Sequence, residues 1–474
     1  MKNNILHSAF FLLFTIMTYG QAEDQLMAEL DSKADTYSQI AGQIWEWAEM
    51  GYLEEKSTAL LQETLKKEGF KIETGVAGIP TAFIAEYGSG YPVIAILGEY
   101  DALPGLSQKA VPEKSPAGGA AGHACGHHLF GTASSAAAIS VKKWLDRSGT
   151  KGTIRFYGCP AEEGGSGKVY MVREGLFDDV DAVLHWHPSS DNGASAGAAL
   201  ANKSGKFRFH GISAHAAGAP ERGRSALDGV EGMNMMVNMM REHIPERSRI
   251  HYVITQGGKA PNVVPDFAEV YYYARHERRD VVANLFDRIV KAAEGAAMGT
   301  GTTVDYEIIG GTHELLPNLT LQKVMHEKMR LVGGVSYNDS EKTFADKIAL
   351  TLGQDSADLN RAESIAPYKT KGTAYGSTDV GDVSFVVPTV GLRAATWVPG
   401  TAAHSWQAVA AGGTSIGHKG MMVAAKTLAL TAVHLFNNQK LISEAKKELE
   451  ERRGEEFEYT PLLGDRPPAL DYRK

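Results

Sequence analysis

Apolar segments that alternate with amphipathic ones predict an α/β domain in the first two hundred residues. The segment 93–97 is almost wholly apolar, as expected for an interior strand of a sheet that is covered on both faces. Apolar residues at helical spacing precede and follow it, which indicates an open sheet with helices packed around it. The predicted strands are 81–87, 93–97, 153–157 and 182–188, and the predicted helices are 26–50, 58–67 and 129–145.

The pattern changes between residues 205 and 309 to strand, helix, strand, strand, helix and strand. This is the order of a ferredoxin-like β-α-β-β-α-β unit, and we expect it to form an inserted domain, residues 204–317. The chain would then return to the first domain, which comprises residues 23–203 and 318–453. Residues 454–474 are charged and contain prolines, so we expect a surface tail. The returning elements are a helix over 319–331, a strand over 389–392 and a helix over 416–436.

Residues 1–22 have the features of a secretory signal. Lys2 supplies a positive start, residues 5–17 are apolar, and Thr18-Tyr19-Gly20 precedes a plausible cleavage site near Gln21. The apolar part is short for a membrane span, although a retained anchor is the alternative. The sequence therefore predicts an exported protein, periplasmic or secreted, with no membrane association after signal removal.

Composition and charge narrow the possible partners. At 474 residues and 43% hydrophobic content, the chain is long enough for two or three domains of about 100–200 residues each. The net charge is −8 and no long basic run occurs, which argues against nucleic acid as a partner. The two cysteines, Cys125 and Cys159, could form a disulfide in an oxidising compartment, and this is the main alternative to a metal-binding role for Cys125.

The loop His123-Ala124-Cys125-Gly126-His127-His128 has the features of half a metal site. Gly126 permits the bend that would turn the Cys125 thiol and the His127 imidazole toward one ion. These two ligand types favour zinc or a neighbouring transition metal over calcium or magnesium. Such a triplet is often incidental, so the prediction depends on ligands elsewhere in the chain.

Further candidate ligands follow predicted strands or lie in later loops. Asp101 ends one strand, and the pair Glu162 and Glu163 follows another, although a solvated turn or a turn cap would also explain them. Two histidines occur in the strand 182–188. We expect His185 and His187 to face opposite ways, so that only His187 points at the site. The five candidate ligands exceed the needs of one zinc ion and suit two metals that share a bridge: Cys125, His127, Glu163, His187 and His404.

Seven stretches, in the expected order along nearly the whole chain, resemble a family of dinuclear metallo-amidohydrolases and peptidases. The family includes aminoacylase, glutamate carboxypeptidases and auxin-conjugate hydrolases, and the stretches are most similar to the p-aminobenzoyl-glutamate hydrolase B-subunit type. The stretches are 98–104, 123–127, 158–167, 213–217, 261–266, 376–384 and 404–407.

This resemblance implies a role for each candidate residue. Cys125 would bridge two divalent metal ions, zinc or manganese first and cobalt or nickel as alternatives, and the other four ligands would complete their coordination. Glu162 would be the general base, and Asp101 would orient a ligand. His215, in the inserted domain, resembles a histidine that stabilises the oxyanion, often across a dimer. Asn262 and Arg275 resemble groups that hold the substrate carboxylate.

Three other histidines receive a supporting or structural assignment. His123, His128 and His185 lie beside the candidate ligands, and His128 departs from the family, in which Asp or Asn commonly follows the Cys-Gly-His triplet. The resemblance also implies that the inserted domain serves as a lid and forms a homodimer.

The expected function is hydrolysis of the amide that joins an acyl or aromatic group to an amino acid, with p-aminobenzoyl-glutamate as the nearest family substrate. A dipeptidase is the alternative within the same class. An exported protein that binds metal or ligand without turnover is the alternative from another class, and a disulfide-linked domain without metal is a third. Export is unusual for an enzyme that acts on a folate fragment, so another N-acyl amino acid or a peptide could be the substrate.

Overall fold

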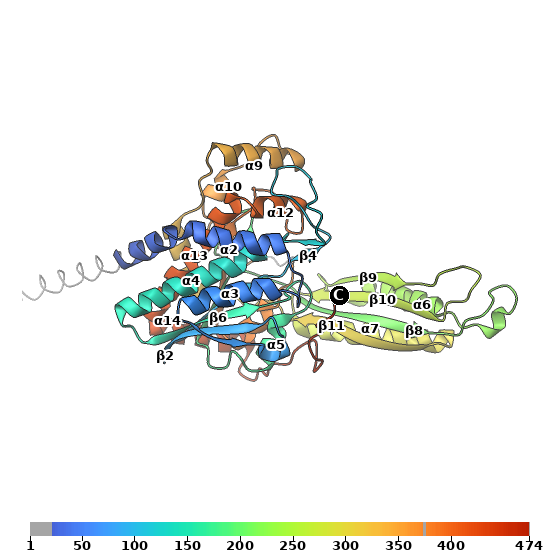
Figure 1. Ribbon diagram of the computed structural model, residues 1–474. Coiled ribbons are helices and arrows are strands. Elements are labelled where there is room, and N and C mark those ends of the chain that lie inside the picture. Colours follow the sequence, from blue (N-terminus) through green and yellow to red (C-terminus); the bar gives the residue numbers. More distant parts are fainter. Residues whose placement is uncertain (1–20, 373–375, 474) are drawn as a thin grey trace, which may run out of the picture.

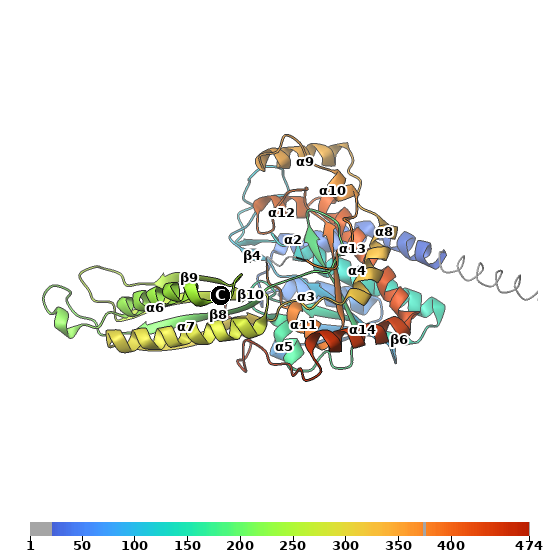
Figure 2. The same cartoon turned by 180° about the vertical axis from the view of Figure 1, so that it is seen from behind.

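The computed structural model describes residues 21–372 and 376–473, which form two domains, each built around one main sheet (Figure 1). The smaller domain extends to one side of the larger one, and both views related by a half turn show the same elongated outline (Figure 2). Residues 1–20 of the expected export signal lie outside the described residues. Within the described part, no helix is long and apolar enough to cross a membrane.

The larger sheet has six strands in the order β1-β2-β6-β3-β7-β12. Strands β6, β3, β7 and β12 are parallel, so their carboxyl ends meet at one edge, whereas β1 and β2 are antiparallel additions. All seven residues of β3 are buried, which agrees with its apolar sequence. The strands are β1 Lys71–Thr74, β2 Phe83–Ser89, β3 Val93–Glu99, β6 Gly152–Cys159, β7 Ala182–Ser189 and β12 Thr389–Ala395.

Helices cover both faces of this sheet. One face carries the larger core, to which the long helix α4 contributes ten apolar residues. Its helices are α2 Ala34–Trp47, α3 Glu55–Lys67, α4 His127–Ser148, α8 Leu319–Val332 and α13 Ser415–Phe436. The other face is covered by the short helices α5 Gly167–Arg173 and α11 Val380–Val386.

The predicted elements of this domain are present with ends that differ by a few residues, except that the helix predicted over 26–50 is broken by a turn at residues 32–33. Several further helices were not predicted. They are α9 Asp339–Thr351, α10 Asn360–Glu363, α12 Trp406–Gly412 and α14 Gln439–Arg453, together with α5 and α11. Helix α9 lies in a polar stretch and begins with a capping box formed by Asn338 and Glu341. Most of the others are short, and a short helix has too few turns to show an apolar period.

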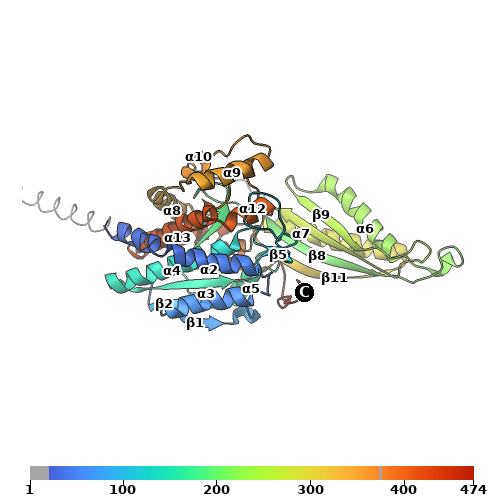
Figure 3. The same ribbon diagram turned by 45° about the horizontal axis from the view of Figure 1, so that its top comes forward.

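The inserted domain has four antiparallel strands in the order β11-β8-β10-β9, with two helices on one face, so the ferredoxin-like prediction is confirmed. The view from above shows α6 and α7 beside this sheet (Figure 3). The opposite face presents Tyr271, Tyr273 and Arg275. The elements are β8 Ala201–His210, α6 Ala226–Met240, β9 Arg249–Gln256, β10 Phe267–His276, α7 Arg279–Thr300 and β11 Thr303–Thr312. Two short strands, β4 Leu103–Pro104 and β5 Ala121–Gly122, pair in the loop above the larger sheet.

Residues 454–473 lie at the surface, where they pack against both domains rather than extending freely from them. Leu463 is 1% exposed, and the Tyr459 hydroxyl donates to Asp382 at 2.8 Å. The charged and proline-rich composition predicted exposure, but isolated apolar and aromatic residues within it provide the contacts.

Candidate active site

The candidate site lies where the carboxyl ends of the parallel strands meet, which is where open α/β sheets place their active sites. Strand β3 ends at Glu99 and leads to Asp101, β6 leads into the turn with Glu162 and Glu163, and β7 carries His187 near its end. Helix α4 begins at His127, directly after the Cys125 loop. Three strand ends and one helix start therefore converge on one point.

The five predicted ligands lie together in two overlapping groups. Cys125, His127 and His187 form one group, and Cys125, Glu163 and His404 form the other, with the ligand atoms of each group within 4.8 Å of one another. The Cys125 sulfur lies 3.4 Å from His187 Nε2, and His404 Nε2 lies 3.3 Å from Glu163 Oε1. Because Cys125 belongs to both groups, its position suits a bridge between two cations.

Asp101 connects two of these ligands. Its Oδ1 accepts from His127 Nδ1 at 2.8 Å, and its Oδ2 accepts from the backbone N–H of Glu163 at 2.8 Å. His187 is oriented in a similar way, since its Nδ1 lies 2.7 Å from the Pro188 carbonyl oxygen. In both histidines the partner at Nδ1 leaves Nε2 available to a cation.

The ligand atoms fit a pair of divalent cations. His127 Nε2 and Glu163 Oε1 are buried and accept or donate no hydrogen bond among the described residues, whereas buried polar atoms are nearly always paired. Burial and the charge of Glu163 raise the pKa of the Cys125 thiol well above its usual range. A bound cation would reverse this direction, because it stabilises the thiolate directly. One thiol, three imidazoles and a carboxylate suit zinc and similar ions.

Glu162 lies beside the ligands without being one of the five. Burial raises its pKa well above the usual range, and the negative charges of Glu99 and Glu163 raise it further. To act as a base, Glu162 must be ionised, and cations held by the neighbouring ligands would favour that charged form.

Sequence reasoning missed a third cluster, Glu99, His127 and Glu162. Glu99 Oε2 lies 3.2 Å from His127 Nε2, without hydrogen-bond geometry, and Glu99 Oε1 lies 2.6 Å from Lys168 Nζ. Lys168 also contacts Asp379 at 2.6 Å, and all three charged side chains are buried. The position of Glu99 two residues before Asp101 at a strand end was a usable signal, whereas Lys168 in an ordinary helix gave none.

The backbone of the glutamate turn is strained and held from several sides. Ala161 and Ser166 have φ values of +57° and +59°, in the left-handed region that non-glycine residues rarely adopt. The Ala161 N–H donates to Glu54 Oε1 at 2.8 Å, and the Tyr52 hydroxyl donates to the Gly165 carbonyl at 2.7 Å. Strain of this kind persists only where surrounding contacts fix the conformation.

The two histidines of β7 share one face of the strand, so the expectation of opposite facing is wrong. Residues two apart in a strand point the same way, and in β7 the alternate residues Leu184 and Trp186 belong to the core on the other side. His187 lies closer to the strand end and reaches the Cys125 sulfur. His185 lies deeper, where burial lowers its pKa to about 3.

The remaining residues of the histidine-rich loop have structural contacts. His123 Nε2 lies 3.0 Å from the Ile44 carbonyl oxygen, and His128 Nε2 lies 3.0 Å from that of Gly412. Both cysteines are buried and free, so the disulfide alternative is not supported: Cys159 is not bonded to Cys125.

The three predicted residues of the inserted domain are not part of the cluster within one chain. His215 lies in the loop that follows β8 and Asn262 in the loop that precedes β10, where the Ala216 N–H donates to the Asn262 carbonyl at 3.1 Å. These loops are at the end of the domain remote from the larger sheet (Figure 1). Both side chains are exposed. Arg275 lies at the near end of β10, opposite Asn202, with its guanidinium 5.3 Å from the centre of the Tyr273 ring.

Comparisons with known proteins agree with this architecture. Residues 201–299 match the model of a peptidase dimerisation domain. The chain is 45% identical to the B subunit of p-aminobenzoyl-glutamate hydrolase from Escherichia coli K12, over 88% of this chain and 93% of that protein. It is 29% identical to the Xaa-Arg dipeptidase of Mus musculus, over 90% and 92% of the two chains.

Solved structures share the fold. A dinuclear metal-binding peptidase of the M20 family from Bacillus subtilis superposes with a TM-score of 0.55 at 17% identity, over 86% of this chain and 99% of that one. At this identity the likeness extends to the fold alone.

Proposed function

Because the chain belongs to the M20 family of metal-dependent peptidases and amidohydrolases, we propose that it hydrolyses N-acyl amino acids such as p-aminobenzoyl-glutamate. The observation that supports this most is the arrangement around Cys125. Five ligand side chains converge there, and Glu162 lies next to them as an additional carboxyl group. A protein that only bound metal would have no use for this extra group. The 45% identical relative is named for the same substrate.

The residues divide the reaction between them. Two divalent cations, for which zinc and manganese are the first candidates, would polarise a water molecule and the substrate carbonyl. They would be held by Cys125, His127, Glu163, His187 and His404. Glu162 takes a proton from the attacking water and passes it to the leaving amine. Asp101 holds His127 and the Glu163 backbone in place while this occurs.

The substrate contacts would come from the inserted domain. His215 would donate to the oxyanion that develops on the amide carbonyl, and Asn262 and Arg275 would hold the free carboxylate. His215 and Asn262 lie remote from their own cluster, so they would serve the site of a second copy in a homodimer. The exposed apolar side chains of α6 and the edge strand β9 support this pairing. They are Met235, Met236, Met239, Tyr252, Val253 and Ile254.

A different partner chain is the alternative to this homodimer, because the 45% identical relative is named as a B subunit and such a name implies another subunit. The mass of the purified chain in solution, measured by light scattering, distinguishes a homodimer from a monomer that needs a different partner.

We also propose that the protein is exported, on the basis of the signal-like residues 1–22. Amino-terminal sequencing of protein recovered from the periplasm or medium should give a start near Gln21. A start at Met1 on protein from the cytoplasm would contradict export.

The deciding experiment is hydrolysis of p-aminobenzoyl-glutamate, a panel of N-acyl amino acids and a panel of dipeptides that includes Xaa-Arg, before and after chelation. We expect chelator-sensitive cleavage and about two metal ions per chain. Cleavage confined to the dipeptides would favour the dipeptidase alternative, which the 29% identical relative supports. Bound metal without turnover on any compound would favour a binding protein.

A further inference from the structure

The segment 459–473 begins against the inserted domain. The carbonyl oxygen of Thr460 accepts from His313 Nε2 at 3.0 Å, just beyond the end of β11. Gly311 of β11 lies so close that a Cβ atom there would be 2.8 Å from the backbone of Leu462. Arg466 Nη2 donates to Glu307 Oε1 at 2.9 Å. This part of the segment is therefore fitted to the last strand of the inserted domain.

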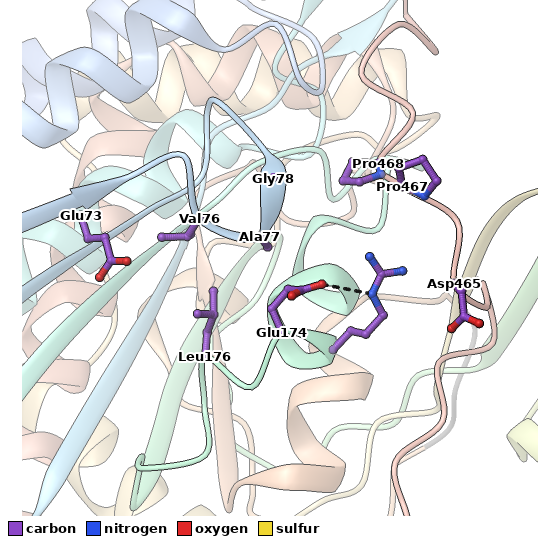
Figure 4. A pocket seen from close by; sticks show the side chains of 10 residues that line it. Glu73, Val76, Ala77, Gly78, Glu174, Leu176, Asp465, Pro467 and Pro468 are labelled. Atoms are coloured by element: carbon purple, nitrogen blue, oxygen red, sulfur yellow. Dashed lines mark ion pairs between the residues drawn. The ribbon is translucent and has the colours of Figure 1, made fainter.

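The middle of the segment lies along one side of a hollow of about 600 Å³. Figure 4 shows Asp465, Pro467 and Pro468 along one side of it and Glu73 and Leu176 along the other. Arg173, at the end of α5, holds this part by donating to the carbonyl oxygens of Gly464 and Arg466 at 3.2 and 2.8 Å. Tyr170 also donates to the Pro467 carbonyl at 3.4 Å, and Leu463 and Leu470 pack against the core on this face of the larger sheet.

The far end contacts the glutamate turn. Arg473 Nη2 donates to the Glu163 carbonyl oxygen at 2.6 Å, and the Tyr472 hydroxyl lies 3.3 Å from the same oxygen. The Tyr472 ring packs edge-on against Tyr52, with centroids 5.5 Å apart. Since Asp101 binds the N–H of Glu163, both backbone groups of this residue are held, one by the strand end and one by the segment.

From these contacts we infer that Tyr472 and Arg473 are positioning residues for amide hydrolysis, an inference that rests on the function proposed above. They hold in place the peptide bond between Glu163 and Gly164, directly after the two glutamates of the turn. This turn contains two non-glycine residues in left-handed conformations, each of which needs outside contacts to persist. A displacement of a catalytic group by about 1 Å can reduce the rate by about 100-fold.

The test compares Arg473→Met with Arg453→Met. Arg453 is a matched control, because it also donates to a backbone carbonyl, that of Phe385, and lies over an aromatic ring, but it does not contact the turn. We expect Arg473→Met to lower kcat about tenfold with KM within about twofold, and Arg473→Lys to restore part of the rate. Arg453→Met should leave both constants unchanged.

Hydrogen exchange of residues 160–166 in the metal-free protein provides a readout that does not depend on a substrate. Arg473→Met should speed exchange there by about tenfold, while Arg453→Met should not, and thermal melting of both variants shows whether they are folded. Equal exchange and equal kcat in the two variants would overturn the inference, as would a loss of kcat without faster exchange. If the wild-type chain cleaves none of the compounds, the proposed function is wrong. The hydrogen-exchange rates would still show whether Arg473 holds the turn.

Discussion

The metal-ligand cluster and the inserted domain differ in how far one chain completes them. In the cluster, buried charges are paired within the chain, as in Lys168 between Glu99 and Asp379. In the inserted domain, Met235 and Met239 are 61% and 64% exposed and His215 faces no site of its own chain. Under the proposed function, one chain would complete the half that holds the metals and Glu162, whereas the half that holds the substrate would need a second molecule.

The largest expected effect is that of Glu162→Gln. The change removes the group that accepts the proton but no ligand, so the rate should fall by about two to four orders of magnitude while metal content stays the same. Initial rates and metal analysis measure both. An exposed glutamate of α3, Glu63→Gln, is the control and should behave as wild type. Unchanged turnover in Glu162→Gln would remove the catalytic assignment.

The metal-ligand half can be tested through Lys168, a buried positively charged side chain. Lys168→Met removes the ammonium group that lies between the buried carboxylates of Glu99 and Asp379, and should destabilise the protein by about 3–5 kcal/mol. Lys440 pairs with Glu444 at the surface, where the two side chains are 90% and 49% exposed, so Lys440→Met should cost less than about 1 kcal/mol. Urea unfolding of both variants measures the difference in their unfolding free energies. Similar losses in the two variants would show that burial of the Lys168 network adds nothing to stability.

The incomplete half can be tested by mixing two variant chains. His215→Ala alone should lose about 100- to 1,000-fold in kcat, as expected for one oxyanion donor. Mixed dimers of His215→Ala and Glu162→Gln chains contain one intact site if His215 acts across the dimer, so co-expression should restore activity. No restoration in verified mixed dimers would place His215 in the site of its own chain or outside the reaction.

The smallest expected effect concerns pH at the junction of the two domains. Burial lowers the pKa of His313 to about 4, below its unfolded value near 6.5, so its contribution to stability is present above pH 6.5 and is lost as the pH falls toward 4. Neighbouring Asp382 acts in the opposite direction, because burial raises its pKa to about 7.

His313→Gln isolates the histidine contribution. Between pH 4.5 and 6.5 the unfolding free energy of the variant should rise less steeply with pH than that of the wild type, by up to about 1.4 kcal/mol per pH unit. Urea unfolding at several pH values gives both slopes. Equal slopes for the variant and the wild type would mean that the pKa of His313 is the same in the folded and the unfolded state.

The sequence predicted the strand ends, the ferredoxin-like domain and the residues that gather at Cys125. These features depend on local patterns, such as the apolar run before Asp101 or the Cys-Gly-His triplet. The Lys168 pair with Asp379 and the Arg473 contact with Glu163 could not be predicted, because each joins residues more than two hundred positions apart without a local pattern. The direction in which the His185 side chain points was predicted wrongly, although the sequence was sufficient to predict it. Residues two apart in a strand lie on the same face, so His185 lies beside His187.

The interrupted order of the larger sheet has a consequence for how the chain folds. Thr389 of β12 pairs opposite Val183 of β7, and the whole inserted domain lies between them in sequence. The four strands of the inserted domain, by contrast, follow one another without interruption. Because distant pairings form more slowly than near ones, the inserted domain can fold as a unit while the larger sheet still lacks its last strand. During synthesis, the exposed methionines of α6 would therefore be available to another copy before the metal ligands had all come together.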